Sequence, residues 1–282
     1  MTSLVSSRNT DRLSFYRTKH CFEKYGEFET IEEFIQYCQW AHENKVRIYI
    51  LGNGSNVLFK SKTVRSLILK NKLKETIKPL DNGRVEISSS AQIVEILKYC
   101  NAQSLESFYY LSSVPATIGG ALAMNAGRGR HQKMTIYDFV ETVTFFDFEH
   151  NRVKTCTASE IVKGYRHTIF TGAQNTLILN AVFKFEPIRL LTDPIVERKK
   201  WSKNFQDYSA PNCGSVFKLA DYRILRKLQG IGIGKTYFSK KTTNWILNKS
   251  ENTVSIRILI SLAKLLHTFL GKTIELELIV IE

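Results

Sequence analysis

A glycine-rich stretch at residues 112–127 constrains this chain more than any other feature of its sequence. It reads SSVPATIGGALAMNAG, so most of its side chains are small. Small side chains allow a backbone to approach a ligand closely, and exposed amide N–H groups in such a loop bind phosphate oxygens. The stretch predicts either a phosphate-binding loop or a tight turn followed by a closely packed helix.

A second glycine turn, at residues 52–56, follows a predicted buried strand at residues 46–51. It reads Gly-Asn-Gly-Ser-Asn, in which the glycines free the backbone and the serine and asparagine add side-chain donors. It does not complete the Gly-x-Gly-x-x-Gly fingerprint, because Val57 occupies the place of the last glycine and no helix is predicted after it. The turn predicts a second phosphate contact, and a sharp β-turn is the alternative.

Helical and strand patterns alternate along the chain and predict an α+β protein. Thr30 and Glu33 form a capping-box pattern at the start of the first helix. Helices are predicted at residues 30–42, 91–100, 193–205, 221–229 and 254–270. Strands are predicted at residues 46–51, 57–59, 66–69, 85–89, 137–148, 175–185 and 273–281. The helix at 254–270 has one apolar face made by Ile258, Leu262, Leu265, Leu266 and Phe269.

The composition indicates a folded protein with an anionic partner. Hydrophobic residues make up 43% and charged residues 23%, as in ordinary globular proteins, but the formal net charge is +14. Nucleic acid, a membrane surface and a phosphorylated small molecule all suit such an excess, and composition does not choose among them. No nucleic-acid-binding motif is visible, so we expect no nucleic-acid partner.

The cysteines and the N-terminal residues give expectations about metals and location. The five cysteines form no CxxC pair, so we expect reduced thiols and no metal site. The first twelve residues are polar and lack the apolar core of a signal peptide. No apolar run approaches the roughly 20 residues of a membrane span. We therefore expect a cytoplasmic protein without a membrane span, and a monomer.

Six segments that occur in one order resemble the MurB family of UDP-N-acetylenolpyruvoylglucosamine reductases. Besides the two glycine segments they are residues 165–170, 214–218 and 243–248 and the final glutamate-containing strand. The resemblance implies an FAD-binding fold of the vanillyl-alcohol-oxidase/MurB type and the shorter subtype of the family. It implies an N-terminal FAD-binding subdomain at 1–70, a second one at 71–187 and a C-terminal α+β substrate-binding domain at 188–282.

The resemblance also implies an FAD-dependent oxidoreductase of peptidoglycan precursor synthesis, and so of cell wall biogenesis, cell shape and cell division. NADPH would reduce FAD, which would reduce the enolpyruvyl group of UDP-N-acetylglucosamine-enolpyruvate to give UDP-N-acetylmuramate. These anionic molecules would give part of the net charge a role. The implied cofactor-binding residues are Gly52, Asn53, Gly54, Ser55, Asn56, Pro115, Thr117, Gly119, Gly120, Asn125, Ala126 and Gly127.

Three catalytic residues follow from the resemblance and from the chemistry it implies. Hydride addition to the enolpyruvyl group leaves negative charge near the substrate carboxylate, so a cation and a proton donor are needed. Arg166 would supply the charge and Ser215 the proton, and Glu277 would be the third residue. Glu275 is the alternative acid, because alternation puts both glutamates on one face of a strand. The implied substrate-binding residues are Tyr165, Lys218 and Asn244. Of these, Lys218 would also support Ser215 as proton donor.

One segment departs from the family pattern, in which Thr-Phe-Arg-x-Gly-Gly precedes the first helix. This chain keeps Arg17 but has Lys19 and His20 in place of the two glycines. Side chains at these positions are expected to crowd the cofactor. A divergent paralogue with flavin chemistry on another nucleotide sugar and a non-catalytic binding protein are therefore the alternatives.

Overall fold

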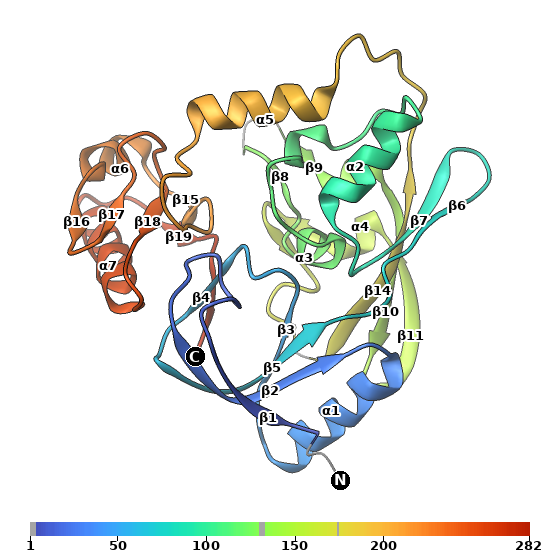
Figure 1. Cartoon of the computed structure of the whole chain (residues 1–282), viewed down its shortest axis with the longest axis horizontal. Coiled ribbons are helices and arrows are strands. Elements are labelled where there is room, and N and C mark those ends of the chain that lie inside the picture. Colours follow the sequence, from blue (N-terminus) through green and yellow to red (C-terminus); the bar gives the residue numbers. More distant parts are fainter. Residues whose placement is uncertain (1–3, 130–132, 174) are drawn as a thin grey trace. The chain divides into compact units, whose positions relative to one another are not determined.

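The structure is a computed structural model that describes residues 4–129, 133–173 and 175–282 (Figure 1). The chain forms two compact units, and both are discontinuous in sequence. Unit 1 contains the described residues up to Tyr25, together with Gly54–Leu67 and Lys203–Glu282. Unit 2 contains Gly26–Asn53 and Ile68–Ser202. This division differs from the three consecutive domains expected from the sequence, at 1–70, 71–187 and 188–282. The functions assigned to those three domains stay a prediction.

Unit 2 is built on a five-stranded antiparallel sheet in the order β11-β10-β14-β7-β6. The predicted strand at 137–148 begins later than expected, because Ile136–Phe139 forms a short 3-10 helix capped by Thr135 and Asp138. The strands at 85–89 and 175–185 are confirmed within one residue at either end. The strands of this sheet are β6 (Ile77–Pro79), β7 (Arg84–Ser88), β10 (Val140–Asp147), β11 (Arg152–Thr157) and β14 (Thr176–Lys184).

Helices cover both faces of this sheet. On one face, α2 (Ile93–Ala102) and α3 (Ile118–Ala123) share a buried apolar cluster with strand residues that include Phe145. Successive strand residues point to opposite faces, so Phe146 leaves this cluster and meets the ring of Phe34 at 6.5 Å. Phe34 belongs to α1 (Ile31–Glu43), which begins where the sequence predicts because the Thr30 hydroxyl accepts the Glu33 N–H.

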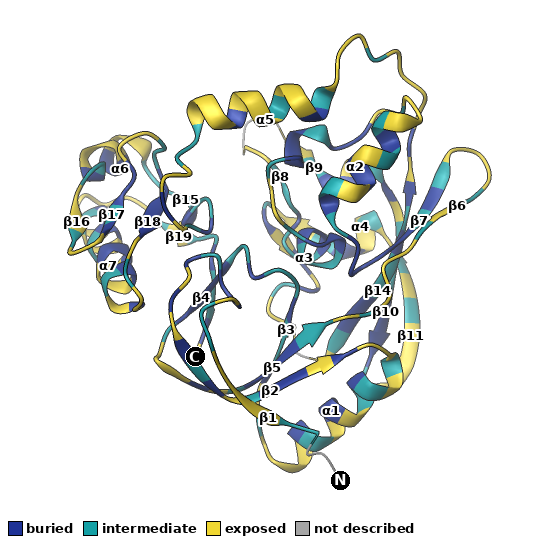
Figure 2. Cartoon of the chain, viewed as in Figure 1, coloured by how far each residue is buried: buried dark blue, intermediate teal, exposed yellow. Residues whose placement is uncertain are grey.

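The helix α5 (Pro194–Phe205) is mostly exposed, as its yellow colour in Figure 2 shows. Two hydrogen bonds within unit 2 connect it to residues 110–113. The Arg198 Nε donates to the Tyr110 carbonyl at 3.1 Å. The Ser113 hydroxyl donates to the buried Ser202 hydroxyl at 2.7 Å. These bonds hold the beginning of the glycine-rich stretch.

The remaining elements of unit 2 are short and connect the sheet to the glycine segments. The predicted strand at 46–51 is found as β3, and it starts two residues later than expected. These elements are β3 (Ile48–Leu51), the 3-10 helix η1 (Tyr109–Leu111), β8 (Gly127–Arg128), β9 (Met134–Thr135), α4 (Ala158–Ile161), β12 (Val162–Gly164) and β13 (His167–Thr168).

Unit 1 gathers N-terminal and C-terminal segments. Within it, β1 (Ser6–Thr10) pairs antiparallel with β2 (His20–Phe28), which ends in unit 2. Its other strands are β4 (Val57–Phe59), the first part of β5 (Thr63–Asn71), β15 (Phe217–Leu219), β16 (Gly232–Ile233), β17 (Thr236–Phe238), β18 (Ile246–Asn248), β19 (Glu275–Leu276) and β20 (Ile279–Ile281). Its helices are α6 (Tyr222–Leu228) and α7 (Val254–Phe269).

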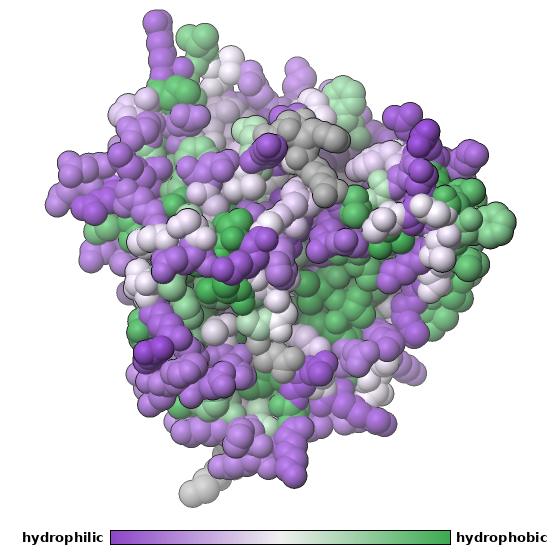
Figure 3. Space-filling view, turned by 180° about the vertical axis from the view of Figure 1, so that it is seen from behind, coloured by the Kyte–Doolittle hydropathy of each residue, from purple (hydrophilic) through white to green (hydrophobic). Residues whose placement is uncertain are grey.

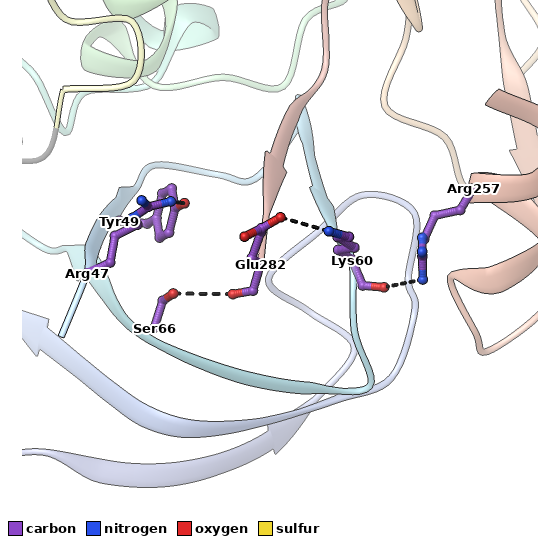
Figure 4. A network of polar contacts seen from close by, with 6 residues as sticks. All are labelled: Arg47, Tyr49, Lys60, Ser66, Arg257 and Glu282. Carbon is purple, nitrogen blue, oxygen red and sulfur yellow. Dashed lines mark hydrogen bonds and ion pairs between the residues drawn. The ribbon is translucent and has the colours of Figure 1, made fainter. Parts of the chain in front are cut away.

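The single strand predicted at 273–281 is wrong, because two short strands with different partners occupy this segment. β19 pairs antiparallel with β15, whereas β20 pairs parallel with β4. Polar contacts extend the second pairing (Figure 4). The Lys60 ammonium lies 2.7 Å from the Glu282 carboxylate, and the Ser66 hydroxyl donates to the main-chain oxygen of Glu282. These contacts fix β4, which follows the second glycine turn directly.

The apolar face predicted for α7 is not the face that the helix buries. Ile258, Leu265 and Phe269 are exposed. The helix is apolar on both sides, so periodicity alone does not choose between them. His267 marks the buried side: its Nε2 accepts the Asp221 N–H at 3.0 Å, and its Nδ1–H donates to the Ala263 carbonyl at 2.8 Å. The residues that α7 buries are Ile256, Leu259, Ile260, Ala263 and His267.

Figure 3 shows hydrophilic side chains distributed over the face that it draws, with hydrophobic patches between them. Among the described residues, no helix has both the length and the apolar character that crossing a membrane requires.

Candidate functional site

The glycine-rich stretch in unit 2 combines close packing with one open position. The Thr117 hydroxyl accepts the Gly120 N–H at 3.3 Å and caps α3. A Cβ on Gly119 would lie 2.9 Å from the Ser89 Cβ, so a glycine is required there by packing. A Cβ on Gly120 would meet only the Thr117 hydroxyl, at 3.4 Å. Packing therefore explains Gly119, whereas Gly120 leaves space beside the backbone.

The first part of the second glycine turn lies against this stretch within unit 2. The Asn53 Nδ2 donates to the Pro115 carbonyl at 3.3 Å and to the Gln92 Oε1 at 2.6 Å. A Cβ on Gly52 would lie 2.5 Å from the Thr117 hydroxyl. Gly52, Asn53, Pro115 and Thr117, far apart in sequence, are therefore neighbours.

The second part of the turn belongs to unit 1 and is fixed there by main-chain packing. Gly54 has φ +69°, and a Cβ on it would lie 2.0 Å from the Leu13 carbonyl, so only glycine fits. The Asn56 Nδ2 donates to the Glu277 carbonyl at 2.9 Å. The Ser55 hydroxyl is half-buried and makes no hydrogen bond with any described residue.

Arg166 is buried in unit 2 and is held by the end of the glycine-rich stretch. It donates to the carbonyl oxygens of Asn125 at 2.8 Å and Gly127 at 2.5 Å, and it stacks on the Tyr165 ring at 4.8 Å. Arg166 has φ 55° and Asn125 has φ 45°. Two non-glycine residues in the left-handed region, bonded to each other, store backbone strain of the kind that clusters at functional sites.

Polar atoms around this stretch lack partners. The buried hydroxyl oxygens of Tyr110 and Ser112 and the Oδ1 of Asn125 have no hydrogen bond in the described part of the chain. Buried polar groups are almost always paired, so unpaired ones close together in sequence need an explanation. They fit a loop that completes its hydrogen bonds with a bound polar group.

Ser215 lies in unit 1 at a turn fixed by Gly214, which has φ +72°. Ser215 forms an isolated antiparallel bridge with Trp245. The neighbouring Asn244 side chain pairs with the main chain of Phe217: its Oδ1 accepts the N–H at 3.0 Å, and its Nδ2 donates to the carbonyl at 2.8 Å. Asn244 is buried with φ 74°, so its amide builds the turn that presents Ser215.

The two C-terminal glutamates have different surroundings in unit 1. The Glu275 carboxylate pairs with the Lys218 ammonium at 3.3 Å. Glu277 lies in the break between β19 and β20, where its N–H donates to the Val216 carbonyl at 2.9 Å. The expected support of Ser215 by Lys218 is not seen, because no hydrogen bond joins these two side chains in unit 1 as described.

Lys19 and His20, which replace two expected glycines, both have places in unit 1. Lys19 is exposed and pairs with Glu251 at 2.6 Å. His20 is buried: its Nδ1 lies 2.7 Å from the Ser61 carbonyl and its Nε2 lies 2.6 Å from the Thr18 hydroxyl. Its ring packs on Phe59, with centroids 5.2 Å apart. The fold of unit 1 therefore uses both side chains.

His20 gives a prediction about stability and pH. Burial lowers the pKa of His20 below its usual value of 6.5. The unfolded chain therefore takes up a proton that the folded chain resists as the pH falls through 6.5 and towards the folded pKa. As the pH decreases over that range, we expect the free energy of unfolding of the wild type to decrease. This one group contributes at most about 1.4 kcal/mol per pH unit.

Urea unfolding between pH 7.5 and 5 checks this expectation, with His20→Gln as the variant that cannot titrate. The difference in unfolding free energy between wild type and variant is expected to shrink as the pH falls. His42→Gln, which removes an exposed histidine, is the matched control for the loss of a histidine side chain. A difference between wild type and His20→Gln that stays constant with pH would contradict the prediction.

Three comparisons with known proteins agree with this arrangement. A family model described as an FAD binding domain matches residues 25–157. The UDP-N-acetylenolpyruvoylglucosamine reductase of Listeria monocytogenes is 31% identical over 228 residues, which cover 78% of this chain and 74% of the relative. The reductase of Geobacillus thermodenitrificans is 27% identical over 262 residues, covering 88% of this chain and 83% of the relative.

A solved structure gives the fold independently. The crystal structure of MurB from Thermus caldophilus matches with a TM-score of 0.78 at 19% identity, covering 99% of this chain and all of the other. The predicted fold class, an α+β protein with the FAD-binding fold of the MurB type, is therefore confirmed. With the relative that is 31% identical, these matches show that the chain belongs to the UDP-N-acetylenolpyruvoylglucosamine reductase family.

Proposed function

We propose that this chain is an FAD-dependent oxidoreductase that uses NADPH to reduce UDP-N-acetylglucosamine-enolpyruvate to UDP-N-acetylmuramate, in peptidoglycan precursor synthesis. The observation that carries this proposal is the 31% identity to a named reductase over 78% of the chain. A change to another nucleotide sugar, or the loss of catalysis altogether, is not favoured, because the relatives that match 78% and 88% of the chain are both named as this reductase.

The residues of the glycine-rich stretch fit an FAD diphosphate. In unit 2, the space beside Gly120 and the unpaired Ser112 hydroxyl, which can donate, suit a phosphate oxygen. The unpaired Asn125 Oδ1 is an acceptor and suits a hydroxyl or N–H group of the cofactor instead. In unit 1, the unpaired hydroxyl of Ser55 suits a phosphate oxygen as well. Bound FAD would carry hydride from NADPH to the enolpyruvyl group. Close packing requires glycine at positions 52, 54, 119 and 127. The loop is shaped by main-chain hydrogen bonds of Pro115 and Ala126 and by the Thr117 hydroxyl, which caps α3.

Arg166 is the proposed partner of the substrate carboxylate. A guanidinium fork matches a carboxylate, and its charge stabilises the negative charge that hydride addition creates. The carbonyl oxygens of Asn125 and Gly127 hold the guanidinium in place, and the Tyr165 ring lies against it. Tyr165 therefore orients Arg166. A direct contact between Tyr165 and the substrate stays a prediction.

Ser215 is the proposed proton donor to the substrate carbon. A serine hydroxyl is a weak acid in water, so its position and surroundings must favour proton transfer. Its turn is fixed by the side chain of Asn244 through Phe217. We assign Asn244 to this positioning, and Lys218 to its ion pair with Glu275.

Glu277 is the proposed third catalytic residue. Its main chain is bonded to Val216, next to Ser215, whereas the carboxylate of Glu275 is held by Lys218. We expect Glu277→Gln to slow reoxidation of the reduced flavin by the enolpyruvyl sugar about 100-fold. Glu275→Gln, two residues away, is the matched control and is expected to stay within about threefold of wild type, because surface ion pairs contribute little. Stopped-flow absorbance measures both, and the reverse order of effects would assign the role to Glu275.

The absorbance spectrum of the purified protein tests the proposed function. We expect a yellow protein whose flavin absorbance bleaches on addition of NADPH and returns when the enolpyruvyl sugar is added without oxygen. A protein that takes up no added FAD would refute the proposal. A reduced flavin that a different nucleotide sugar reoxidises, and this one does not, would move the activity to another substrate.

A further inference from the structure

We propose that Lys70 supplies positive charge to the diphosphate of the flavin dinucleotide, an inference that rests on the proposed function. Lys70 lies near the end of β5, in the part of that strand that belongs to unit 2. Its Nζ donates to the carbonyl oxygen of Gly52. No sequence motif marks this lysine, because it reaches the turn from a strand about twenty residues further along the chain.

The contact places the ammonium where two segments of the proposed cofactor loop meet. Gly52 packs on the Thr117 hydroxyl, and the adjacent Asn53 is bonded to Pro115. The Gly52 carbonyl is the atom that Lys70 holds, so the ammonium fixes the direction of the peptide at the start of the turn. Lys70 therefore lies beside both segments without belonging to either.

Lys70 forms no ion pair with any described residue. The side chain is half-buried, and in the described part of the chain no carboxylate oxygen lies within 4 Å of its Nζ. Burial and the nearby Lys72 both lower its pKa, and Glu27 opposes them more weakly. A half-buried ammonium whose one hydrogen-bond partner among the described residues is a neutral carbonyl loses solvation, and the more distant Glu27 compensates only in part. An anion bound at the turn would complete that compensation.

The chemistry of the site favours a phosphate group as this anion. Lysine binds phosphate as a point charge with three N–H donors, and the Gly52 carbonyl uses one of them. The FAD diphosphate and the diphosphate of the UDP-sugar substrate share this chemistry. We assign the contact to FAD, because Lys70 touches the glycine turn that the FAD binding domain match includes.

Ligand titrations of the flavin-free protein test the inference, with binding followed by flavin fluorescence or calorimetry. Lys70→Met keeps the length of the side chain and removes the charge, and we expect it to weaken FAD binding about 10–100-fold in low salt. The loss is expected to shrink in 0.5 M salt, where the Debye length falls to roughly 4 Å. Riboflavin, which has no phosphate, is expected to bind wild type and variant equally. Lys70→Arg, which keeps the charge, is expected to retain most of the affinity.

Lys72→Met is the matched control, because Lys72 is an exposed lysine on the same segment. Equal FAD affinity of wild type and Lys70→Met would overturn the inference and leave the proposed function standing. Equal losses for FAD and riboflavin, with a lower melting temperature of the flavin-free variant, would show a purely structural lysine and also overturn it. Loss of UDP binding with FAD binding intact would assign the charge to the substrate instead. A wild type that binds no flavin would refute the proposed function as well.

Discussion

Replacing Ser215 with alanine is expected to abolish turnover while reduction of the flavin by NADPH continues. Ser215 is proposed to protonate the substrate carbon, a step that only the second half-reaction requires. Loss of a positioned general acid typically costs about 10²–10⁴-fold in rate. Stopped-flow absorbance separates the two half-reactions, because NADPH bleaches the flavin and the enolpyruvyl sugar restores its colour. We expect Ser215→Ala to bleach at the wild-type rate and to recover its colour at that much lower rate.

The control for this variant is Ser209→Ala, six positions before it in unit 1. The Ser209 hydroxyl is exposed and donates to the Asp207 carboxylate, so its loss is expected to change both half-reactions less than threefold. Equal slowing of bleaching and recovery in Ser215→Ala would contradict the role as proton donor. Such a result would indicate a disturbed turn, since Ser215 also bridges Trp245 through its main chain.

Local patterns predicted most elements because their causes are local. Thr30 caps α1 with its own side chain, and the glycine at position 54 occupies a backbone conformation that a side chain resists. The last strand was predicted wrongly because alternation of Glu275 to Ile281 does not reveal that β15 and β4 each pair with part of it. The buried face of α7 depends on His267, which bonds to the main chain of a different helix. Both errors concern partners distant in sequence.

The candidate site was predictable only where a motif carries it. The two glycine segments were predicted from their small residues and Arg166 from the resemblance. The carbonyl oxygens that hold Arg166 were not predicted, because main-chain acceptors leave no mark in a sequence. For the same reason Asn244 was expected to bind substrate, whereas its amide is paired with Phe217. Lys70 was missed entirely, since its partner is the carbonyl of Gly52. A contact between a side chain and a distant main-chain atom can be identified only once the fold is known.

Replacing Arg166 with lysine is expected to lower the rate of reoxidation by the enolpyruvyl sugar about 10²–10³-fold, even though the charge remains. An ammonium group is a point donor and does not reproduce the planar fork that reaches both the Asn125 and Gly127 carbonyls. Those carbonyls would then lose a buried donor, so the free energy of unfolding is expected to fall by about 1–3 kcal/mol. Stopped-flow absorbance and urea unfolding measure the two effects separately.

Arg152→Lys is the matched control, because Arg152 is an exposed arginine of unit 2 at the start of β11. It is expected to leave both measurements within error of wild type. If Arg166→Lys lost stability but kept its reoxidation rate, Arg166 would be a structural anchor of the glycine-rich stretch alone. If it lost rate without stability, the carbonyl contacts would matter less than the guanidinium's contact with substrate. Loss of both is the expected result, because one fork holds the loop and the strained Asn125 and Arg166 backbones fix that fork in place.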